Sequence, residues 1–454
     1  MQKKVKIEFW GGAGSVTGSN FLLEIDGKKI LIDCGLNQGT KMADDINWEP
    51  FQYAVNTIDI LFVTHAHVDH LGRVPKLISE GFQGKIYSTL PTKSLAQPMI
   101  EDTAFILGHN REFDLAEIYS ENNIKSALSL WEGFPYHEKI KITDELSFTF
   151  YNAGHILGSA MILFNYNGKN ILFTGDLGNS PSPILPDTDK VEGVDYLIME
   201  SVYGDRNHES RDERKKLLEE VIEDNFKRKG TLLIPTFSLE RSQELLFELN
   251  DLVENRRIPI MPIFFDSPLA IKLTEIFKQY KEYFNENAKA AMVHDKYIFD
   301  FPGLHTTLKT EESKTIFKYP DPKVIIAGSG MSSGGRIVHH EKEHLPNPNN
   351  TILLTGYQSA GTLGRLIQEG VKSVRIAGEE IKVKAKVVNI MGYSGHKDSD
   401  ALINFVEEMQ ETVKKVFVVM GEPKSSLFLA QKLKDNLGLE AETPSMGDSV
   451  TLEL

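Results

Sequence analysis

The stretch that decides the fold is His65-Ala66-His67-Val68-Asp69-His70, which directly follows the apolar run IDILFVT at residues 58–64. The run is short and rich in β-branched and aromatic residues, so it predicts a buried strand. Three imidazoles and a carboxylate then leave the end of that strand. Such nitrogen and oxygen donors suit Zn²⁺ and other first-row metal ions, and they would be costly to bury without a cation. The alternative, a histidine-rich surface loop, is disfavoured by the preceding strand.

Four other expected strands also end in a potential metal ligand or catalytic carboxylate. The residues at or just beyond these strand ends are Asp33, His155, Asp176 and Glu200. A single Asp after a strand is usually a turn residue. Strands that repeatedly deliver Asp, His or Glu at their carboxyl ends instead build one site on the rim of a sheet. The sequence therefore predicts a metal centre at such a rim, together with residues 65–70.

Taken together, these motifs resemble those of the metallo-β-lactamase superfamily, whose first four motifs match Asp33, residues 65–70, His155 and Asp176 in the same order. Within that superfamily the chain resembles the β-CASP ribonucleases, and particularly the bacterial and archaeal relatives of the nuclease subunit of the cleavage and polyadenylation specificity factor. Four more stretches carry this likeness, which covers essentially the whole chain: GGAGSVTGS at 11–19, ESVYGDR at 200–206, GMSSGGRIVHH at 330–340 and YSGHKD at 393–398.

The alternation of expected strands and helices agrees with the α/β fold that the resemblance implies, a metallo-β-lactamase αββα sandwich with an inserted α/β domain of the β-CASP type. We expect the first part of the metallo-β-lactamase domain at residues 1–205 and its second part at 386–454. The inserted domain, with a parallel sheet, is expected at 206–385. Helices are expected at about 91–109, 115–131, 211–229 and 240–255.

The resemblance implies two metal ions, which we expect to be Zn²⁺, with Mn²⁺ as an alternative. The first ion would be held by His65, His67 and His155. The second would be held by Asp69 and His70, and Asp176 would bridge both ions. Two ions at such a site can share a hydroxide that attacks a scissile phosphate.

The remaining motif residues are expected to assist this hydrolysis. His396 is the candidate general acid for the leaving oxygen, because imidazole titrates near neutral pH. Glu200 would fix its tautomer and favour its protonated form. Asp69 would orient the attacking hydroxide as well as bind metal, and Asp33 would support the ligand histidines from behind.

One position departs from the family pattern. A late motif of the family is a histidine after a strand, followed by Gly-Glu, whereas here the strand at residues 416–419 ends in Met420-Gly421-Glu422. A thioether is a soft ligand that suits Cu(I) far better than Zn²⁺. The second metal is therefore expected to lack one ligand and to be held more weakly than the first.

A glycine-rich stretch at residues 328–336 precedes an expected helix, and backbone N–H groups at a helix N-terminus suit a phosphate. The predicted RNA phosphate contacts are Ser332, Ser333, Gly335, Arg336 and Arg241. The alternative for the glycine-rich stretch is a tight turn. The alternative for Arg241 is an ordinary solvated or paired surface group.

Composition limits the class of protein. The chain has 454 residues, of which 41% are hydrophobic and 25% charged, as in a soluble protein of several domains. No apolar run reaches the roughly 18 residues that span a membrane, and the single cysteine, Cys34, fits a reducing compartment. A cytoplasmic location is expected. The net charge of −14 argues against nonspecific binding of polyanions, although metal ions can oppose it locally.

The predicted function is metal-dependent hydrolysis of single-stranded RNA in RNA processing or decay, by endonuclease action, 5′-exonuclease action or both. One alternative is a catalytically weakened RNA-binding subunit, which Met420 alone favours. The other is a metallo-β-lactamase-fold hydrolase of a thioester or lactam, which has no need of an inserted domain or of a His396–Glu200 pair. RNA is the expected partner, no membrane is expected, and a homodimer remains an open option.

Overall fold

The structure is a computed structural model that describes residues 4–39, 45–108, 115–208, 211–295, 297–356, 358 and 361–453. The chain forms two compact units. The first comprises Met1–Ser182, Pro186–Asn207 and Gly395–Leu454, and the second comprises Pro183–Leu185 and His208–Ser394. The predicted α/β fold class, with one domain inserted into another, is confirmed, whereas the domain boundaries at 205 and 385 stay predictions. Among the described residues, none of the helices combines the length and the apolar character that a membrane span needs.

Two sheets form the centre of the first unit, and each contains seven strands in the described residues. One sheet has the strand order β22-β1-β2-β3-β4-β5-β6 and the other β21-β20-β11-β10-β9-β8-β7. The first sheet consists of β1 (Val5–Gly11), β2 (Asn20–Ile25), β3 (Lys28–Ile32), β4 (Ile60–Phe62), β5 (Lys85–Thr89), β6 (Trp131–Phe134) and β22 (Ser449–Leu452). The second consists of β7 (Ile140–Lys141), β8 (Leu146–Asn152), β9 (Ala160–Tyr166), β10 (Lys169–Phe173), β11 (Tyr196–Met199), β20 (Lys415–Val418) and β21 (Glu440–Glu442).

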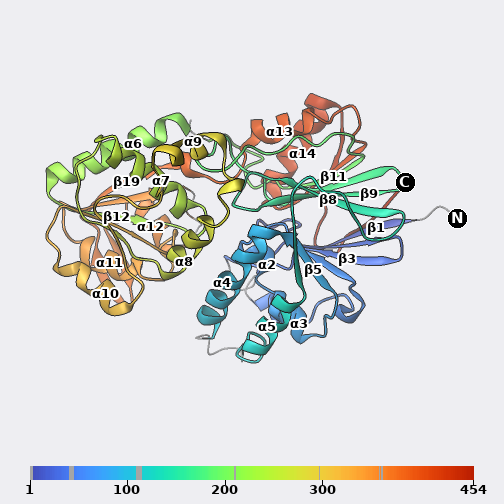
Figure 1. Ribbon diagram of the computed structural model, residues 1–454, viewed down its shortest axis with the longest axis horizontal. Coiled ribbons are helices and arrows are strands. Elements are labelled where there is room, and N and C mark those ends of the chain that lie inside the picture. Colours follow the sequence, from blue (N-terminus) through green and yellow to red (C-terminus); the bar gives the residue numbers. More distant parts are fainter. Residues whose placement is uncertain are drawn as a thin grey trace. The chain divides into compact units, whose positions relative to one another are not determined.

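Helices cover the outer face of each sheet, which gives the four layers of an αββα sandwich (Figure 1). The first sheet is covered by α2 (Val68–Leu71), α3 (Val74–Ser79), α4 (Leu90–Leu107) and α5 (Glu121–Ser129). The second is covered by α13 (Ser399–Glu407) and α14 (Pro423–Leu437). The helix expected at 91–109 is α4, and residues 109–114 lie outside the described residues. The helix expected at 115–131 is shorter, because the buried Trp131 pairs with β5 as the first residue of β6.

Aromatic side chains between the two sheets anchor the strand that carries the histidine cluster. Phe62, at the end of β4, packs against Phe148 and Phe164 of the second sheet with ring centroids 4.8 and 5.1 Å apart. All three are buried, and such edge-to-face pairs add to the stabilisation that burial provides. Residues 65–70 therefore leave a rigid strand end at the rim of the sandwich.

The described residues of the second unit form a six-stranded sheet in which every neighbouring pair is parallel, with the order β14-β13-β15-β12-β16-β19. Its strands are β12 (Thr231–Pro235), β13 (Ile263–Phe265), β14 (Leu304–Thr306), β15 (Lys323–Ala327), β16 (Thr351–Thr355) and β19 (Lys386–Ile390), and β17 (Ser373–Ile376) and β18 (Glu379–Lys382) form a separate hairpin. Helices α6 (Arg211–Arg228) and α7 (Arg241–Glu254) lie on one side of the sheet, and α10 (Thr310–Thr315) and α11 (Ile337–His344) on the other (Figure 1). The other helices are α8 (Pro268–Phe277), α9 (Glu286–His294) and α12 (Leu363–Gln368).

Candidate metal centre and general acid

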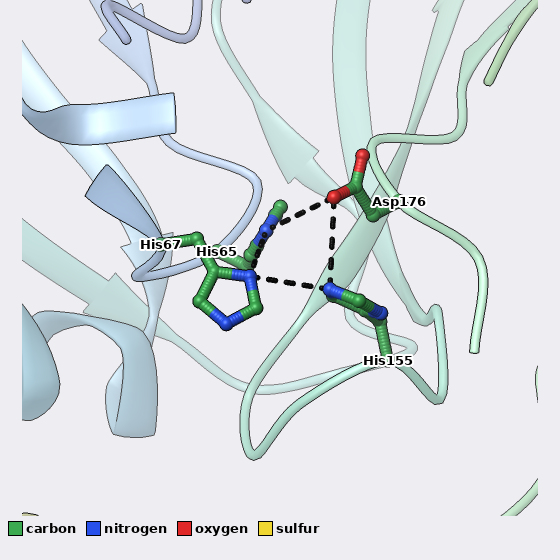
Figure 2. Close-up of side chains that lie close together, drawn as sticks. All are labelled: His65, His67, His155 and Asp176. Carbon is green, nitrogen blue, oxygen red and sulfur yellow. Dashed lines mark hydrogen bonds and ion pairs between the residues drawn. The ribbon is translucent and has the colours of Figure 1, made fainter. Parts of the chain in front are cut away.

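Four side chains from three strand ends converge at the rim of the first unit. His65 and His67 lie between β4 and α2, His155 lies between β8 and β9, and Asp176 follows β10. Their donor atoms all lie within 4.8 Å of one another. Figure 2 shows the four side chains turned toward a common point.

The distances between these donors fit a metal ion. His67 Nδ1 lies 3.1 Å from His65 Nε2 and 3.2 Å from His155 Nε2. Asp176 Oδ2 lies 3.5 Å from His65 Nε2 and 3.6 Å from His155 Nε2. Ligands about 2.0–2.1 Å from a tetrahedral zinc ion are separated from one another by roughly 3.3 Å. The donor set therefore has the size and composition of a first-row metal site.

The protonation of these histidines suits ligation. Burial lowers the pKa of His65 and of His155 well below the usual range, so both rings are neutral at physiological pH. His155 Nδ1 lies 3.0 Å from the backbone carbonyl oxygen of Gly395, and a carbonyl can only accept. The proton of His155 is therefore on Nδ1, and its Nε2 lone pair faces Asp176.

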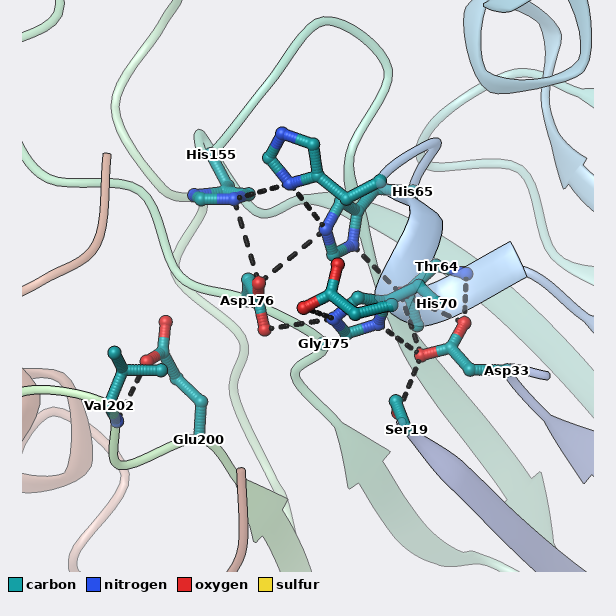
Figure 3. A network of polar contacts seen from close by, with 12 residues as sticks. Ser19, Asp33, Thr64, His65, His70, His155, Gly175, Asp176, Glu200 and Val202 are labelled. Atoms are coloured by element: carbon teal, nitrogen blue, oxygen red, sulfur yellow. Dashed lines mark hydrogen bonds and ion pairs between the residues drawn. The ribbon is translucent and has the colours of Figure 1, made fainter. Parts of the chain in front are cut away.

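A second group of donors adjoins the first through Asp176 (Figure 3). His70 Nε2 lies 3.3 Å from Asp176 Oδ1 and 4.0 Å from Asp69 Oδ2. Both His70 Nε2 and Asp176 Oδ1 are buried, and neither has a hydrogen-bond partner among the described residues. Burial acts against a charged His70, yet the Asp176 and Asp33 carboxylates raise its pKa well above the usual range. A positive charge is thus favoured between His70 and Asp176, and a second cation would supply it.

Asp33 holds His70 in place from the side away from Asp176 (Figure 3). Its Oδ2 lies 2.7 Å from His70 Nδ1, which directs His70 Nε2 toward Asp176. The carboxylate of Asp33 is itself fixed, since it accepts hydrogen bonds from Ser19 Oγ at 3.0 Å and from the Thr64 backbone N–H at 2.8 Å. These contacts support the expected role of Asp33, which is to orient a ligand histidine without binding the metal itself.

His396 lies beside the same centre and is paired with Glu200. Its Nδ1 lies 3.2 Å from Glu200 Oε1 and 4.0 Å from Asp176 Oδ2. Glu200 is fully buried, and its two oxygens accept hydrogen bonds from the backbone N–H groups of Leu177 and Val202. Burial acts to lower the pKa of His396, but Glu200 and Asp176 raise it to about 9. His396 is therefore protonated at neutral pH.

Comparison with known proteins agrees with this site. The Metallo-beta-lactamase superfamily domain matches residues 22–195, the Beta-Casp domain matches 242–367, and the Zn-dependent metallo-hydrolase RNA specificity domain matches 380–444. Ribonuclease TTHA0252 of Thermus thermophilus is 35% identical over 446 residues, which are 98% of this chain and 100% of that protein. The chain belongs to the β-CASP family of metallo-β-lactamase-fold ribonucleases.

Other known proteins are similar to this chain over most of its length. Transcription termination factor FttA of Pyrococcus abyssi is 34% identical over 99% of this chain and 71% of that protein. The RNase J-like protein of Methanocaldococcus jannaschii is 32% identical over 98% of this chain and 99% of that protein. A crystal structure of a protein of unknown function from Enterococcus faecalis covers 99% of this chain with a TM-score of 0.59 and 13% identity, which shows a common fold alone.

Met420, the position that departs from the β-CASP pattern, is packed into the core. Its side chain is 2% exposed and belongs to the apolar cluster between the two sheets. A Cβ built on Gly12 would lie 2.3 Å from Met420 Sδ, so the thioether packs directly against that glycine. Met420 also lines a cavity together with Asp33 and Glu200. The expectation that the second metal lacks a ligand here stays a prediction.

Three residues that support the site were not predicted as part of it. Thr64 and Ser19 hold Asp33, and Gly395 orients His155. All three lie in or directly beside the motifs, which is the only signal that the sequence offers. Gly395 acts through its backbone carbonyl, and the type of residue at a position does not indicate a backbone contact.

The predicted RNA contacts in the β-CASP unit stay predictions, and several of these side chains already have partners. Arg336 donates to Asp266 Oδ1 at 2.6 Å and to the Thr307 carbonyl at 2.9 Å. Ser332 is buried and donates to Glu341. The remaining predicted contacts are an exposed Ser333, an exposed Gly335 at a φ of 73°, and Arg241, which donates to the Thr355 carbonyl at 2.7 Å.

Proposed function

We propose that the protein hydrolyses phosphodiester bonds of single-stranded RNA, in RNA processing or decay, with two zinc ions at the rim of its first unit. One observation carries the proposal. The ligand-type cluster of His65, His67 and His155 and the His396–Glu200 pair both meet at Asp176. Metal-assisted hydrolysis requires metal ligands and a protonated general acid close together. Here both groups lie next to the Asp176 carboxylate.

The donors suit the proposed metals. Three imidazoles and a carboxylate favour Zn²⁺ at the first position, and the carboxylate-rich second position also suits Mn²⁺. Ions bound here would lower the pKa of a water molecule and neutralise charge on the phosphate. Asp33 holds the lone pair of His70 in the ligating direction, and the Gly395 carbonyl does the same for His155.

His396 would deliver the proton that the leaving oxygen needs. Its Nδ1 faces Glu200, so the proton available for transfer is on Nε2, in a side chain that remains 24% exposed. Glu200 is buried and accepts two backbone hydrogen bonds, so it can keep that tautomer and the positive charge in place. Asp69 can accept a hydrogen bond from the attacking water and orient it. General-acid assistance of this kind contributes about 10²–10⁴-fold to a rate.

The other candidate functions have less support. The RNA-binding subunit rests on Met420 alone, although the other expected ligands are retained and His396 keeps its carboxylate partner. A hydrolase of small thioesters or lactams would make no use of that pair or of the inserted unit.

The test is an assay of end-labelled single-stranded RNA with and without a chelator, together with elemental analysis of the purified protein. We expect chelator-sensitive cleavage and bound zinc. Cleavage products of one defined RNA carrying either a 5′-phosphate or a 5′-hydroxyl separate endonuclease from 5′-exonuclease action, both of which the proposal includes. Protein without transition metal that still cleaves RNA in the chelator would contradict it.

A further inference from the structure

The parallel sheet of the second unit reverses its winding between β12 and β15. The chain after β12 crosses to β13, beyond β15, whereas the chain after β15 crosses to β16, beyond β12. The connecting helices α7 and α11 accordingly lie on opposite sides of the sheet (Figure 1). Open α/β sheets bind ligands at such a reversal, outside the carboxyl ends of the two strands.

An exposed aromatic ring stands at this reversal. Phe237 lies just beyond the end of β12 and is 38% exposed. The loop after β15 contains Gly330, and a Cβ built there would lie 2.6 Å from Cδ2 and 2.8 Å from Cε2 of Phe237. The ring therefore packs directly on the backbone of the glycine-rich loop, and part of the residue remains open to solvent.

The polar groups that follow β12 and β13 at this edge of the sheet suit a neutral or anionic ligand. Ser238 Oγ and Ser267 Oγ lie 3.4 Å apart next to Gly328, and they offer hydroxyl donors and acceptors. The Asp266 carboxylate, which precedes Ser267, already has two partners. Arg336 Nη1 lies 2.6 Å from its Oδ1, and His340 Nε2 lies 2.7 Å from its Oδ2. An exposed aromatic ring at the same edge of a sheet as hydroxyl groups is a typical surface for a nucleoside.

We propose that Phe237 stacks against one nucleobase of the RNA substrate at the topological reversal beyond the carboxyl ends of β12 and β15. This inference rests on the proposed function. Every base has a π face, so a stacking residue accepts any sequence but requires an unpaired base. Phe237 would thus select single-stranded over double-stranded RNA.

Binding of a short single-stranded RNA tests the proposal, measured at equilibrium with the full chain carrying His396→Ala so that the RNA stays intact. Base stacking on an aromatic ring is typically worth about 5–100-fold in affinity. We expect Phe237→Ala to weaken binding by such a factor. Phe237→Leu should weaken it similarly, because leucine fills space without stacking, whereas Phe237→Tyr should bind as the parent does. Phe226→Ala is the matched control, since Phe226 is also 38% exposed but lies on α6.

A scan with single abasic nucleotides locates the contact. In the parent, one abasic position should weaken binding, and in Phe237→Ala the same position should no longer matter. Equal affinities for Phe237→Ala and Phe226→Ala, or a Phe237→Leu variant that binds like the parent, would overturn the stacking role. If the His396→Ala parent does not bind RNA and the protein without substitutions does not cleave it, the proposed function itself fails, which is a different result.

Discussion

His155 donates its Nδ1 proton to the backbone carbonyl of Gly395 at a distance of 3.0 Å, directly beside His396. A ligand-type histidine and the candidate acid are thereby joined through one loop. The Gly395 carbonyl also accepts a hydrogen bond from the Asn179 backbone N–H, and the Lys397 N–H donates to Leu177. The loop that carries the acid is thus held against the loop that carries Asp176, and its backbone orients His155 whatever side chain is at position 396.

His396→Ala should slow RNA cleavage by about 10²–10⁴-fold and leave the metal content unchanged, because the Gly395 carbonyl remains in place. Initial rates and elemental analysis on the same preparation measure both quantities. His137→Ala is the control, since His137 is an exposed histidine of the same unit that pairs with Asp189. Loss of metal from His396→Ala would instead make His396 a ligand and contradict its role as the acid.

Asp33→Ala should weaken the second metal site by about 10–100-fold, because His70 loses the carboxylate that orients its ring. The first site should be affected less. Competition titration with a chromophoric chelator resolves the two affinities. Asp59→Ala is the control, because Asp59 also accepts a backbone N–H in the same sheet, from Lys29, but is not part of the metal centre. An equal loss of metal affinity at both sites would contradict this role. Asp33 would then stabilise all the loops at the rim and not His70 in particular.

The ligands could be predicted from the sequence because each of them follows a strand with a recognisable pattern. The apolar run at 58–64 and the alternation before His155 both fix where a strand ends, and a strand end fixes where the next side chain lies. The helix expected at 115–131 is confirmed as α5 over residues 121–129, and its last residues failed for the converse reason. Trp131 fits a helix locally, but it pairs with Ile86 of β5, which no local pattern reveals.

Partners that are distant in sequence could not be predicted. The structure pairs Arg336, whose contact with an RNA phosphate stays a prediction, with Asp266, 70 residues away in the sequence. Thr64 holds Asp33 with its backbone N–H, and Gly395 orients His155 with its backbone carbonyl. Backbone groups are common to all residues, so neither contact has a residue-type signature. The sequence thus specifies which side chains reach the rim, and the packing of the sheets determines what each of them contacts.

Glu341→Gln should make the protein more stable at pH 9 and change little at pH 5. Glu341 is buried, and its Oε1 accepts a hydrogen bond from the Ser332 hydroxyl. Its Oε2 has no hydrogen-bond partner within the part of the chain that the structure describes. Burial raises its pKa from 4.5 to about 8. The folded state thus binds this proton more tightly than the unfolded state, so its contribution to stability is complete below about pH 4.5 and is lost as the pH rises through 8.

The expected gain for Glu341→Gln at pH 9 is at most about 5 kcal/mol in the free energy of unfolding. Thermal unfolding of the metal-loaded protein between pH 5 and pH 9 measures it. Glu343→Gln, on the exposed side of the same helix, should leave the pH dependence of the parent unchanged. A parallel decline of the parent and Glu341→Gln would show that Glu341 does not titrate in this range.

Met420→His should tighten the weaker metal site and reduce the dependence of activity on added Zn²⁺ or Mn²⁺. In the parent that site would have Asp69, His70 and the bridging Asp176 as its protein ligands, so titration should show one tight and one loose site. Position 420 borders the cavity that Asp33 and Glu200 line, and an imidazole there adds a nitrogen donor. Met420→Leu is the control, because it keeps the apolar volume against Gly12 and offers no donor. An unchanged second-site affinity in Met420→His, with a lower melting temperature, would place the side chain in the apolar cluster and mean that the enzyme works with six ligands.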